Sequence, residues 1–244
     1  MVIALRNSQD AFYQTMRAFD LAEKYQIPVI LLSDQYIGDA TATVPPFDPQ
    51  RVQVADPGMD YDGKGEYLRY RYTASGISPR LIPGTSRHLV TIDSDEHDEK
   101  GWITESSEVR TKMVDKRMKK LEGIEQQLQE PEFIGSAGFE TLILGWGSTW
   151  GPIKEAIALL NEGEQDKYAA LVFGDVYPLP QKLLKEKAGK AKIIINVEQN
   201  ATGQLAGLIS EETGITCNGG ILKYDGRQIS GEEIAHRIRK GEVK

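Results

Sequence analysis

The stretch Thr141-Leu-Ile-Leu-Gly-Trp-Gly-Ser-Thr-Trp-Gly-Pro152 decides the fold, because a short strand pattern runs through a glycine-rich turn into a helix. Thr141 to Leu144 is the kind of short apolar run that forms a strand. Pro152 stands where the first residue of a helix is expected, since proline lacks an N–H that would have no partner there. The apolar positions of the predicted helix follow at helical spacing, at Ile153, Ile157, Leu159 and Leu160.

The same alternation of strand and helix continues to the end of the chain. The pattern predicts strands over residues 169–173, 192–197 and 221–222, with helices over 181–187, 204–212 and 230–239. Strands that alternate with helices at this spacing are typical of a parallel, doubly wound α/β domain. The sequence therefore predicts such a domain over residues 137–244.

Two loops in this predicted domain follow strands and are candidates for binding. Glycines after a strand let a backbone approach a pyrophosphate at a helix N-terminus, so Gly145 to Gly151 invites a dinucleotide interpretation. The spacing Gly-x-Gly-x-x-x-Gly differs from the dinucleotide fingerprint, and a structural turn is the favoured interpretation. The second loop is Glu198-Gln-Asn-Ala-Thr-Gly203, which leads into the helix predicted over 204–212.

The N-terminal segment carries part of a second α/β unit. Ser8 and Asp10 suit the start of a helix that runs to about Lys24, since they supply a cap and an acidic first turn. Residues 29–32 are a continuous apolar run, which predicts a strand buried on both faces in a parallel sheet, and residues 1–5 supply another strand. Two strands and one helix cannot form a core, so this segment is expected to need more chain or a partner.

The middle of the chain loses this periodicity. Residues 38–101 are rich in proline and glycine, and predict loop with short strands such as 67–72. A long amphipathic helix is predicted from residue 106 or 107 to 130. Six basic residues and one acid lie within 110–120, where a solvated helix face is favoured over a phosphate-binding patch.

The run Asp93-Ser-Asp-Glu-His-Asp-Glu99 places five carboxylates and His97 within seven residues. Oxygen ligands with an imidazole suit several divalent ions, so a metal site is one interpretation. The spacing matches neither an EF-hand nor a zinc protease, and a solvated acidic loop is therefore favoured.

Composition narrows the class of protein. The 244 residues carry 29 Lys and Arg against 36 Asp and Glu, a net charge of −7, which argues against general nucleic-acid or anionic-membrane binding. No window approaches about 18 consecutive apolar residues, so no membrane span is expected. The single cysteine, Cys217, excludes an internal disulfide and any cysteine-ligated iron–sulfur cluster carried by this chain alone. A cytoplasmic globular protein is expected.

Several stretches of the sequence, taken in order, resemble a known family. They are Ala18-Phe-Asp-Leu-Ala-Glu-Lys-Tyr, Gly76-Ile-Ser-Pro-Arg-Leu-Ile-Pro-Gly, Asp95-Glu-His-Asp-Glu-Lys-Gly, Leu144-Gly-Trp-Gly-Ser-Thr and Val197-Glu-Gln-Asn-Ala-Thr-Gly-Gln-Leu. Together they resemble alpha subunits of 2-oxoacid:ferredoxin oxidoreductases, the 2-oxoglutarate branch most. The resemblance implies the end of a thiamine pyrimidine-binding domain over 1–50, an irregular connection with the long helix over 51–136, and a transketolase C-terminal-like domain over 137–244.

The resemblance also implies a chemistry. Enzymes of this family use thiamine diphosphate to decarboxylate a 2-oxoacid oxidatively, form an acyl-CoA and pass electrons through iron–sulfur centres to ferredoxin. The resemblance implies that the beta subunit holds thiamine diphosphate and Mg²⁺ in the assembled enzyme. It also implies that another chain holds the iron–sulfur cluster. The family's Tyr-Pro-Ile-Thr-Pro motif and its activating glutamate are not found, so the chain is expected to start about where that half of the pyrimidine domain ends. No catalytic or metal-binding residue is assigned to this chain, which is expected to be inactive alone.

The leading hypothesis is that the chain serves subunit assembly and active-site closure in such an enzyme, with a beta subunit, ferredoxin and CoA as partners. The alternatives are a stand-alone nucleotide- or CoA-binding module that uses the two loops above, and a fragment without activity. Arg80 would face an anionic group and His97 would lie near the active cleft. The residues expected to meet the partner subunit are Glu198, Asn200 and Gln204.

Overall fold

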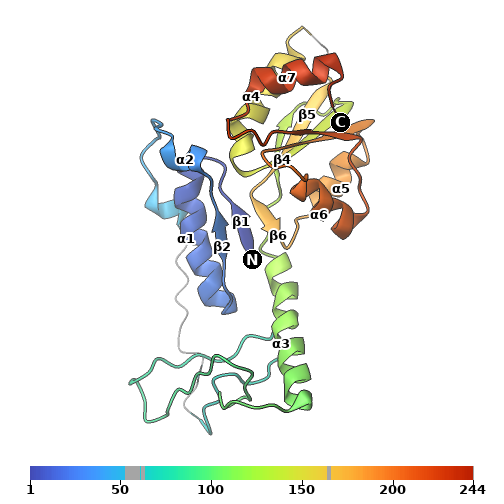
Figure 1. The fold of residues 1–244 in the computed structure, drawn as a ribbon. Helices are drawn as coiled ribbons and strands as arrows, with labels where there is room; N and C mark the ends of the chain where they lie inside the picture. Colours follow the sequence, from blue (N-terminus) through green and yellow to red (C-terminus); the bar gives the residue numbers. More distant parts are fainter. Residues whose placement is uncertain (53–60, 62–63, 164–165, 244) are drawn as a thin grey trace. The chain divides into compact units, whose positions relative to one another are not determined.

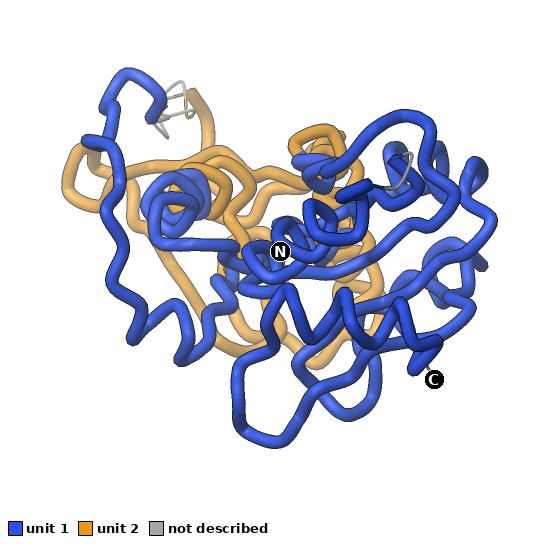
Figure 2. The backbone as a smooth tube through the Cα atoms, turned by 90° about the horizontal axis from the view of Figure 1, so that it is seen from above, with its two compact units in different colours: residues 1–18, 29–52, 128–244 blue, residues 19–28, 53–127 orange. Residues whose placement is uncertain are grey.

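The computed structural model describes residues 1–52, 61, 64–163 and 166–243 of the chain, and Figure 1 shows its ribbon. The chain divides into two compact units, drawn in two colours in Figure 2. Unit 1 consists of residues 1–18, 29–52 and 128–244, and unit 2 of residues 19–28 and 53–127. The domain boundaries predicted from the sequence, after residues 50 and 136, stay a prediction.

A five-stranded sheet forms the centre of the C-terminal part of unit 1. Its strands are β3 (Glu132–Gly135), β4 (Thr141–Trp146), β5 (Tyr168–Phe173), β7 (Ile193–Glu198) and β8 (Gly219–Leu222). They lie in the order β3-β5-β4-β7-β8 and are parallel except for β3, which pairs antiparallel with β5. The predicted parallel sheet is confirmed, and the antiparallel edge strand β3 is an addition to it.

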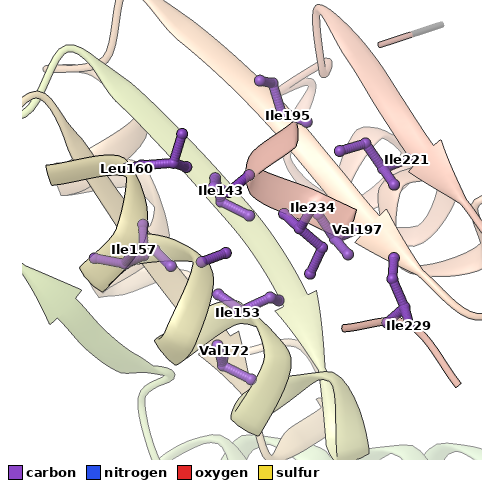
Figure 3. Packing of buried hydrophobic residues seen from close by; sticks show 13 residues of the cluster. Ile143, Ile153, Ile157, Leu160, Val172, Ile195, Val197, Ile221, Ile229 and Ile234 are labelled. Carbon is purple, nitrogen blue, oxygen red and sulfur yellow. The ribbon is translucent and has the colours of Figure 1, made fainter. Parts of the chain in front are cut away.

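Helices cover both faces of this sheet, as a doubly wound fold requires (Figure 1). They are α4 (Trp150–Asn161), α5 (Lys182–Ala188), α6 (Gln204–Thr213) and α7 (Gly231–Lys240). Successive residues of β4 point to opposite faces, so Ile143 packs with α4 and α7 in the cluster of Figure 3. Leu142 and Leu144 pack with α5 and α6 on the other face. Burial of each Ile or Leu side chain contributes about 1.5–3 kcal/mol to the free energy of unfolding. The sheet with helices on both faces confirms the predicted α/β fold class.

The N-terminal segment forms a smaller sheet in unit 1. Its strands β1 (Val2–Ala4), β2 (Ile30–Leu32) and β6 (Asp175–Tyr177) lie in the order β2-β1-β6, and α1 (Ser8–Tyr25) connects β1 to β2. β1 pairs parallel with β2 and antiparallel with β6. The predicted strand exists, but the prediction that it is buried on both faces is wrong, because Ile30 is 53% and Leu32 36% exposed. Among the described residues β2 is an edge strand with β1 as its neighbour.

Unit 2 combines irregular chain with the helix α3 (Ser107–Glu125). Ser106 caps this helix, since its hydroxyl accepts a hydrogen bond from the backbone N–H of Val109 at 3.4 Å. The helix ends at Glu125 rather than at the predicted residue 130. The prediction of a strand over residues 67–72 is wrong, because these residues are irregular and form a turn at 69–70. A small apolar cluster lies here, formed by Tyr61, Tyr67 and Leu81.

Short helical turns lie at three further places in unit 1. α2 (Gln35–Asp39) follows β2, and single 3-10 turns cover Pro49–Arg51 and Gly147–Thr149. None of the described helices is both long and apolar enough to cross a membrane.

Candidate functional site

The two loops singled out in the sequence meet at one edge of the five-stranded sheet. β5 lies on one side of β4 and β7 on the other, so the strand order reverses between β4 and β7. In open α/β sheets, ligands bind at such a switch point, outside the carboxyl ends of the strands. The turn at 147–149 and the loop at 199–204 line a cavity of about 240 Å³ at this position. The N-terminal segment of unit 1 adds Ala4, Leu5, Leu32, Ser33 and Asp34 to the lining.

The glycines of the first loop are explained by packing. A Cβ at Gly145 would lie 2.2 Å from Ile153 Cδ1 and 2.8 Å from Thr149 Oγ1, so a larger residue would force both side chains to move. Gly147 has φ +56°, a left-handed conformation that glycine adopts without strain. Thr149 Oγ1 donates to Trp146 O at 2.7 Å and accepts from Trp146 N at 3.0 Å. These contacts account for the turn without a bound phosphate.

Glu198 is the last residue of β7 and is fully buried. Its carboxylate accepts hydrogen bonds from the backbone N–H groups of Leu205 at 3.0 Å and Ala206 at 3.1 Å, at the N-terminus of α6. The helix dipole stabilises a negative charge in this position. Three side chains donate to the same carboxylate: Trp146 Nε1 at 3.1 Å, Asn196 Nδ2 at 3.0 Å and Asn200 Nδ2 at 2.7 Å. Glu198 thus fixes both loops to the start of α6.

Asn200 shapes the second loop with both ends of its side-chain amide. Its Nδ2 donates to Glu198, and its Oδ1 accepts from the backbone N–H of Gly203 at 2.7 Å and of Thr202 at 3.1 Å. Gln204, the first residue of α6, is exposed and lines the cavity. Its side-chain amide has no hydrogen-bond partner among the described residues, so it is available to a group that enters the cavity.

A chain of hydrogen bonds crosses the wall of the cavity. Ser148 Oγ donates to the Asp34 carboxylate and accepts from Gln199 Nε2 at 3.4 Å. Gln199 Oε1 in turn accepts from the backbone N–H of Ile229 at 3.1 Å. Asp34 also accepts from the backbone N–H of Ile37 at 3.1 Å, as the N-cap of α2. Of the residues that line the cavity, Asp34 is the charged one, so the site suits a polar hydrogen-bonding group better than a phosphate.

Arg80 and His97 lie in unit 2 and contact other residues of that unit. The Arg80 guanidinium forms an ion pair with Glu23. His97 Nδ1 lies 2.8 Å from Asp95 O, and the centroid of its ring is 3.8 Å from that of Tyr70. The structure places the other three candidate residues together at the second loop. The roles predicted for all five stay predictions.

Within the acidic run at 93–99, Glu96 is paired with α3. It bonds Arg117 at 2.8 Å and Arg110 at 3.0 Å, and the hydrogen bond from Arg117 is the main cause that holds the pKa of Glu96 below its usual value. Among the described residues, no group of three or more His, Cys, Asp or Glu side chains could hold a metal ion.

Ser148 and Gln199 lie within the two candidate loops but are not among the residues named as candidates from the sequence, and Asp34 lies outside both loops. Ser148 and Gln199 each follow the carboxyl end of a parallel strand, and that position is the signal that could have found them. Asp34 reaches the cavity from the N-terminal sheet, a tertiary placement that no local pattern predicts.

Comparison with known proteins gives a consistent result. Residues 1–116 match the family described as pyruvate flavodoxin/ferredoxin oxidoreductase, thiamine diphosphate-binding. The chain is 32% identical over 246 residues to 2-oxoacid:ferredoxin oxidoreductase 2, subunit alpha, of Aeropyrum pernix, a match that covers 98% of this chain and 38% of that protein. It is 26% identical over 243 residues to the 2-oxoglutarate synthase subunit KorA of Archaeoglobus fulgidus, covering 100% of this chain and 61% of that subunit.

A solved structure agrees with these relatives. The fold is similar, with a TM-score of 0.90 and 30% identity, to 2-oxoglutarate:ferredoxin oxidoreductase from Magnetococcus marinus with 2-oxoglutarate, coenzyme A and succinyl-CoA bound. That match covers 98% of this chain and 41% of the other, so this chain spans about two fifths of the length of that protein and of the Aeropyrum pernix subunit. The resemblance seen in the sequence motifs is confirmed, because nearly the whole chain is similar to alpha subunits of 2-oxoacid:ferredoxin oxidoreductases.

Proposed function

We propose that this chain is part of the alpha subunit of a thiamine diphosphate-dependent 2-oxoacid:ferredoxin oxidoreductase. Such an enzyme decarboxylates a 2-oxoacid oxidatively, transfers the acyl group to CoA and passes the electrons to ferredoxin. The observation that carries the proposal is the match to the Magnetococcus marinus enzyme, whose TM-score of 0.90 holds over 98% of this chain. That enzyme is named for 2-oxoglutarate, and we infer the same class of substrate here. A cytoplasmic location belongs to the same proposal.

In this proposal the cofactors are held by the assembled enzyme and not by this chain alone. No described group of three or more His, Cys, Asp or Glu is placed to bind a metal ion, and the sequence has one cysteine. One cysteine is too few to ligate an iron–sulfur cluster. We assign Mg²⁺ and thiamine diphosphate to a site completed by the beta subunit, and the iron–sulfur cluster to another chain. Thiamine diphosphate, when bound there, supplies the carbanion stabilisation.

We further infer that this chain serves subunit assembly and active-site closure, and the switch-point cavity supports that role. Pockets that hold whole small ligands have volumes of about 300–1,000 Å³. This cavity has about 240 Å³, and its polar lining includes the unpaired amide of Gln204. Those properties suit a short polar loop of the beta subunit. A loop that bonds Gln204 would close the cavity against water.

Co-expression with the beta subunit tests this proposal. In the first arrangement, the tagged chain is purified after co-expression with an untagged beta subunit. In the second arrangement, the part of the Aeropyrum pernix alpha subunit that this chain does not match is co-expressed as well. The proposal predicts a single species whose mass, measured by light scattering, is the sum of its chains. Elution of this chain by itself in both arrangements would overturn it.

A charge placed in the cavity tests the role of Gln204. Gln204→Glu adds a second carboxylate beside Asp34, and we expect it to weaken association with the beta subunit by about tenfold, or 1.4 kcal/mol. Gln126→Glu makes the same change at an exposed position of unit 2 and is the matched control. Equal association of the two variants would leave no interface role for the cavity.

The alternative function is a stand-alone nucleotide- or CoA-binding module. One observation favours it: both loops line one cavity at a switch point, where such ligands bind in α/β folds. The negative charge of Asp34 and the lack of a cation among the lining residues argue against a phosphate there. Calorimetry of the chain alone with NAD, ADP and CoA separates the two functions. Micromolar binding that depends on Gln204 would favour the module, and its absence would favour assembly.

A further inference from the structure

The basic stretch of α3 contains both paired and unpaired side chains. Four of its six basic residues bond carboxylates: Arg110 and Arg117 bond Glu96, Lys112 bonds Glu108, and Lys119 bonds Glu122. Lys116 and Lys120 form no ion pair with any described carboxylate. Lys120 Nζ donates to the carbonyl of Gln26 at 2.9 Å, and Lys116 Nζ lies 5.7 Å from the ring centroid of Tyr70. The solvated helix face favoured from the sequence therefore does not describe these two lysines.

A third cation accompanies the two lysines inside unit 2. Arg69 has its Cζ 5.0 Å from the centroid of the same Tyr70 ring, and its Nη1 bonds the neutral Oε1 of Gln26 at 2.9 Å. Burial first, and then the neighbouring positive charges, lower the pKa of Lys116 and of Lys120 to about 8. Three partly buried cations without a carboxylate bonded to them repel one another. A bound anion would stabilise this arrangement.

A cavity of about 350 Å³ opens beside Lys116. Lys112, Lys116 and Lys119 line it from positions i, i+4 and i+7 of α3, so these side chains share one face of the helix. The remaining lining residues are Tyr72, Thr73, Ala74 and Asp115. Besides Asp115, the carboxylate of Glu99 lies near the cavity, where it accepts a hydrogen bond from the backbone N–H of Tyr72 at 2.8 Å. Its negative charge attracts the ammonium group of Lys116. Three lysines against one aspartate make the lining positive.

We propose that this cavity binds a phosphoryl group, with Lys116 as its main cation. A lysine ammonium binds phosphate as a point charge with three donors. Lys112 and Lys119, on the same helix face, are paired with Glu108 and Glu122, so Lys116 is the lysine of the lining without an ion pair among the described residues. Arg69 and Lys120, which do not line the cavity, add to the positive field within it.

Calorimetry on the full 244-residue chain tests the site. Inorganic phosphate and ADP are titrated separately at low ionic strength, where attraction between charges is least screened. We expect at least one of them to bind with a Kd at or below about 1 mM, and Lys116→Gln to weaken that binding by at least tenfold. Lys190→Gln is the matched control, an exposed lysine of unit 1 that is paired with Glu186, and leaves the binding unchanged.

The two probes identify the source of the phosphoryl group. Binding of both indicates a site for free phosphate, and binding of ADP alone indicates a nucleotide whose phosphate enters the cavity. Either result supports the proposal when Lys116→Gln abolishes it, and that dependence also separates this site from the switch-point cavity of unit 1. Equal affinities of the wild type and Lys116→Gln, or no heat for either probe up to about 10 mM, would overturn the proposal.

Thermal unfolding distinguishes a binding role of Lys116 from a structural one. Lys116→Gln removes one of three mutually repelling charges, so its unfolding midpoint without ligand is expected at or above that of the wild type. A lower midpoint would assign Lys116 to the stability of unit 2 and overturn the binding role.

Discussion

Arg17 and Asp175, which are 158 residues apart in the sequence, form a two-point ion pair within unit 1. Arg17 Nη1 bonds Asp175 Oδ1 at 2.6 Å, and Nη2 bonds Oδ2 at 2.7 Å. The Asp175 side chain is fully buried and also accepts a hydrogen bond from the backbone N–H of Gln129 at 2.8 Å. The pair therefore ties α1 to β6, and so joins distant segments of the unit.

Removing the carboxylate of this pair should destabilise unit 1. We expect Asp175→Asn to lower its free energy of unfolding by about 3–5 kcal/mol, because the partly buried charge of Arg17 loses its partner. Urea unfolding followed by tryptophan fluorescence measures the change. Glu140→Gln removes the ion pair with Lys192 at the surface and is expected to leave the midpoint unchanged. A shift for Asp175→Asn no larger than that control contradicts the structure.

Glu198→Gln tests the network that holds the two loops of the cavity. An amide keeps the shape of the side chain, but it loses the charge that faces the N-terminus of α6 and turns an NH₂ group toward hydrogen-bond donors. We expect a loss on the order of 2–4 kcal/mol in the free energy of unfolding of unit 1. Glu211→Gln, at an exposed position of the same helix, is the matched control. Equal stability of the two variants would show that Glu198 does not anchor the loops.

The reactivity of Cys217 reports on the same region. Burial first, and then the charge of Glu198, raise the pKa of the Cys217 thiol from 9.0 to about 11. Because the thiolate is the nucleophile, we expect iodoacetamide to alkylate the folded chain at pH 8 about 100-fold more slowly than the unfolded chain. Mass spectrometry of quenched samples follows the reaction. Equal rates with and without urea would mean that Cys217 is not buried.

The lysine cluster of unit 2 predicts a dependence of stability on pH. Lys116 and Lys120 have pKa values lowered to about 8 from 10.5. Between these two values the unfolded chain binds more protons than the folded chain, so this pair makes the free energy of unfolding rise with pH. We therefore expect the wild type to gain stability relative to Lys116→Gln as pH increases from about 8 to 10.5. Urea unfolding at each pH measures the difference, with Lys190→Gln as control, and parallel curves for all three chains would contradict the burial of Lys116.

The parallel strands of the five-stranded sheet could be predicted from the sequence because each is a short apolar run followed by a helix. β4, β5, β7 and β8 end or begin within two residues of the predicted positions. β3 and β6 were not predicted, since Glu132–Gly135 starts with a charge and Asp175–Tyr177 has three residues. They become strands because β5 and β1 pair with them, and such pairing between distant segments leaves no local pattern.

The candidate site was predictable in part for the same reason. Glu198, Asn200 and Gln204 lie together because they belong to one strand end, its loop and the next helix. Asp34 lines the cavity from another sheet, which the sequence does not indicate. The partial burial of Lys116 in α3 depends on distant residues such as Tyr70 that pack against it, so the sequence of the helix does not distinguish it from the neighbouring lysines. An apolar run likewise indicates that β2 is a strand, but it does not indicate how many neighbours the strand has.

The central claim is that this chain is part of a 2-oxoacid:ferredoxin oxidoreductase. Its most direct test is whether the assembled complex transfers electrons to ferredoxin only when a 2-oxoacid substrate is present. This chain is purified with the beta subunit and the unmatched part of the Aeropyrum pernix alpha subunit, and is supplied with thiamine diphosphate, Mg²⁺, CoA and ferredoxin. We predict ferredoxin reduction, followed by absorbance, that requires both CoA and a 2-oxoacid and is faster with 2-oxoglutarate than with pyruvate. An assembled complex that reduces no ferredoxin with either 2-oxoacid would contradict the claim.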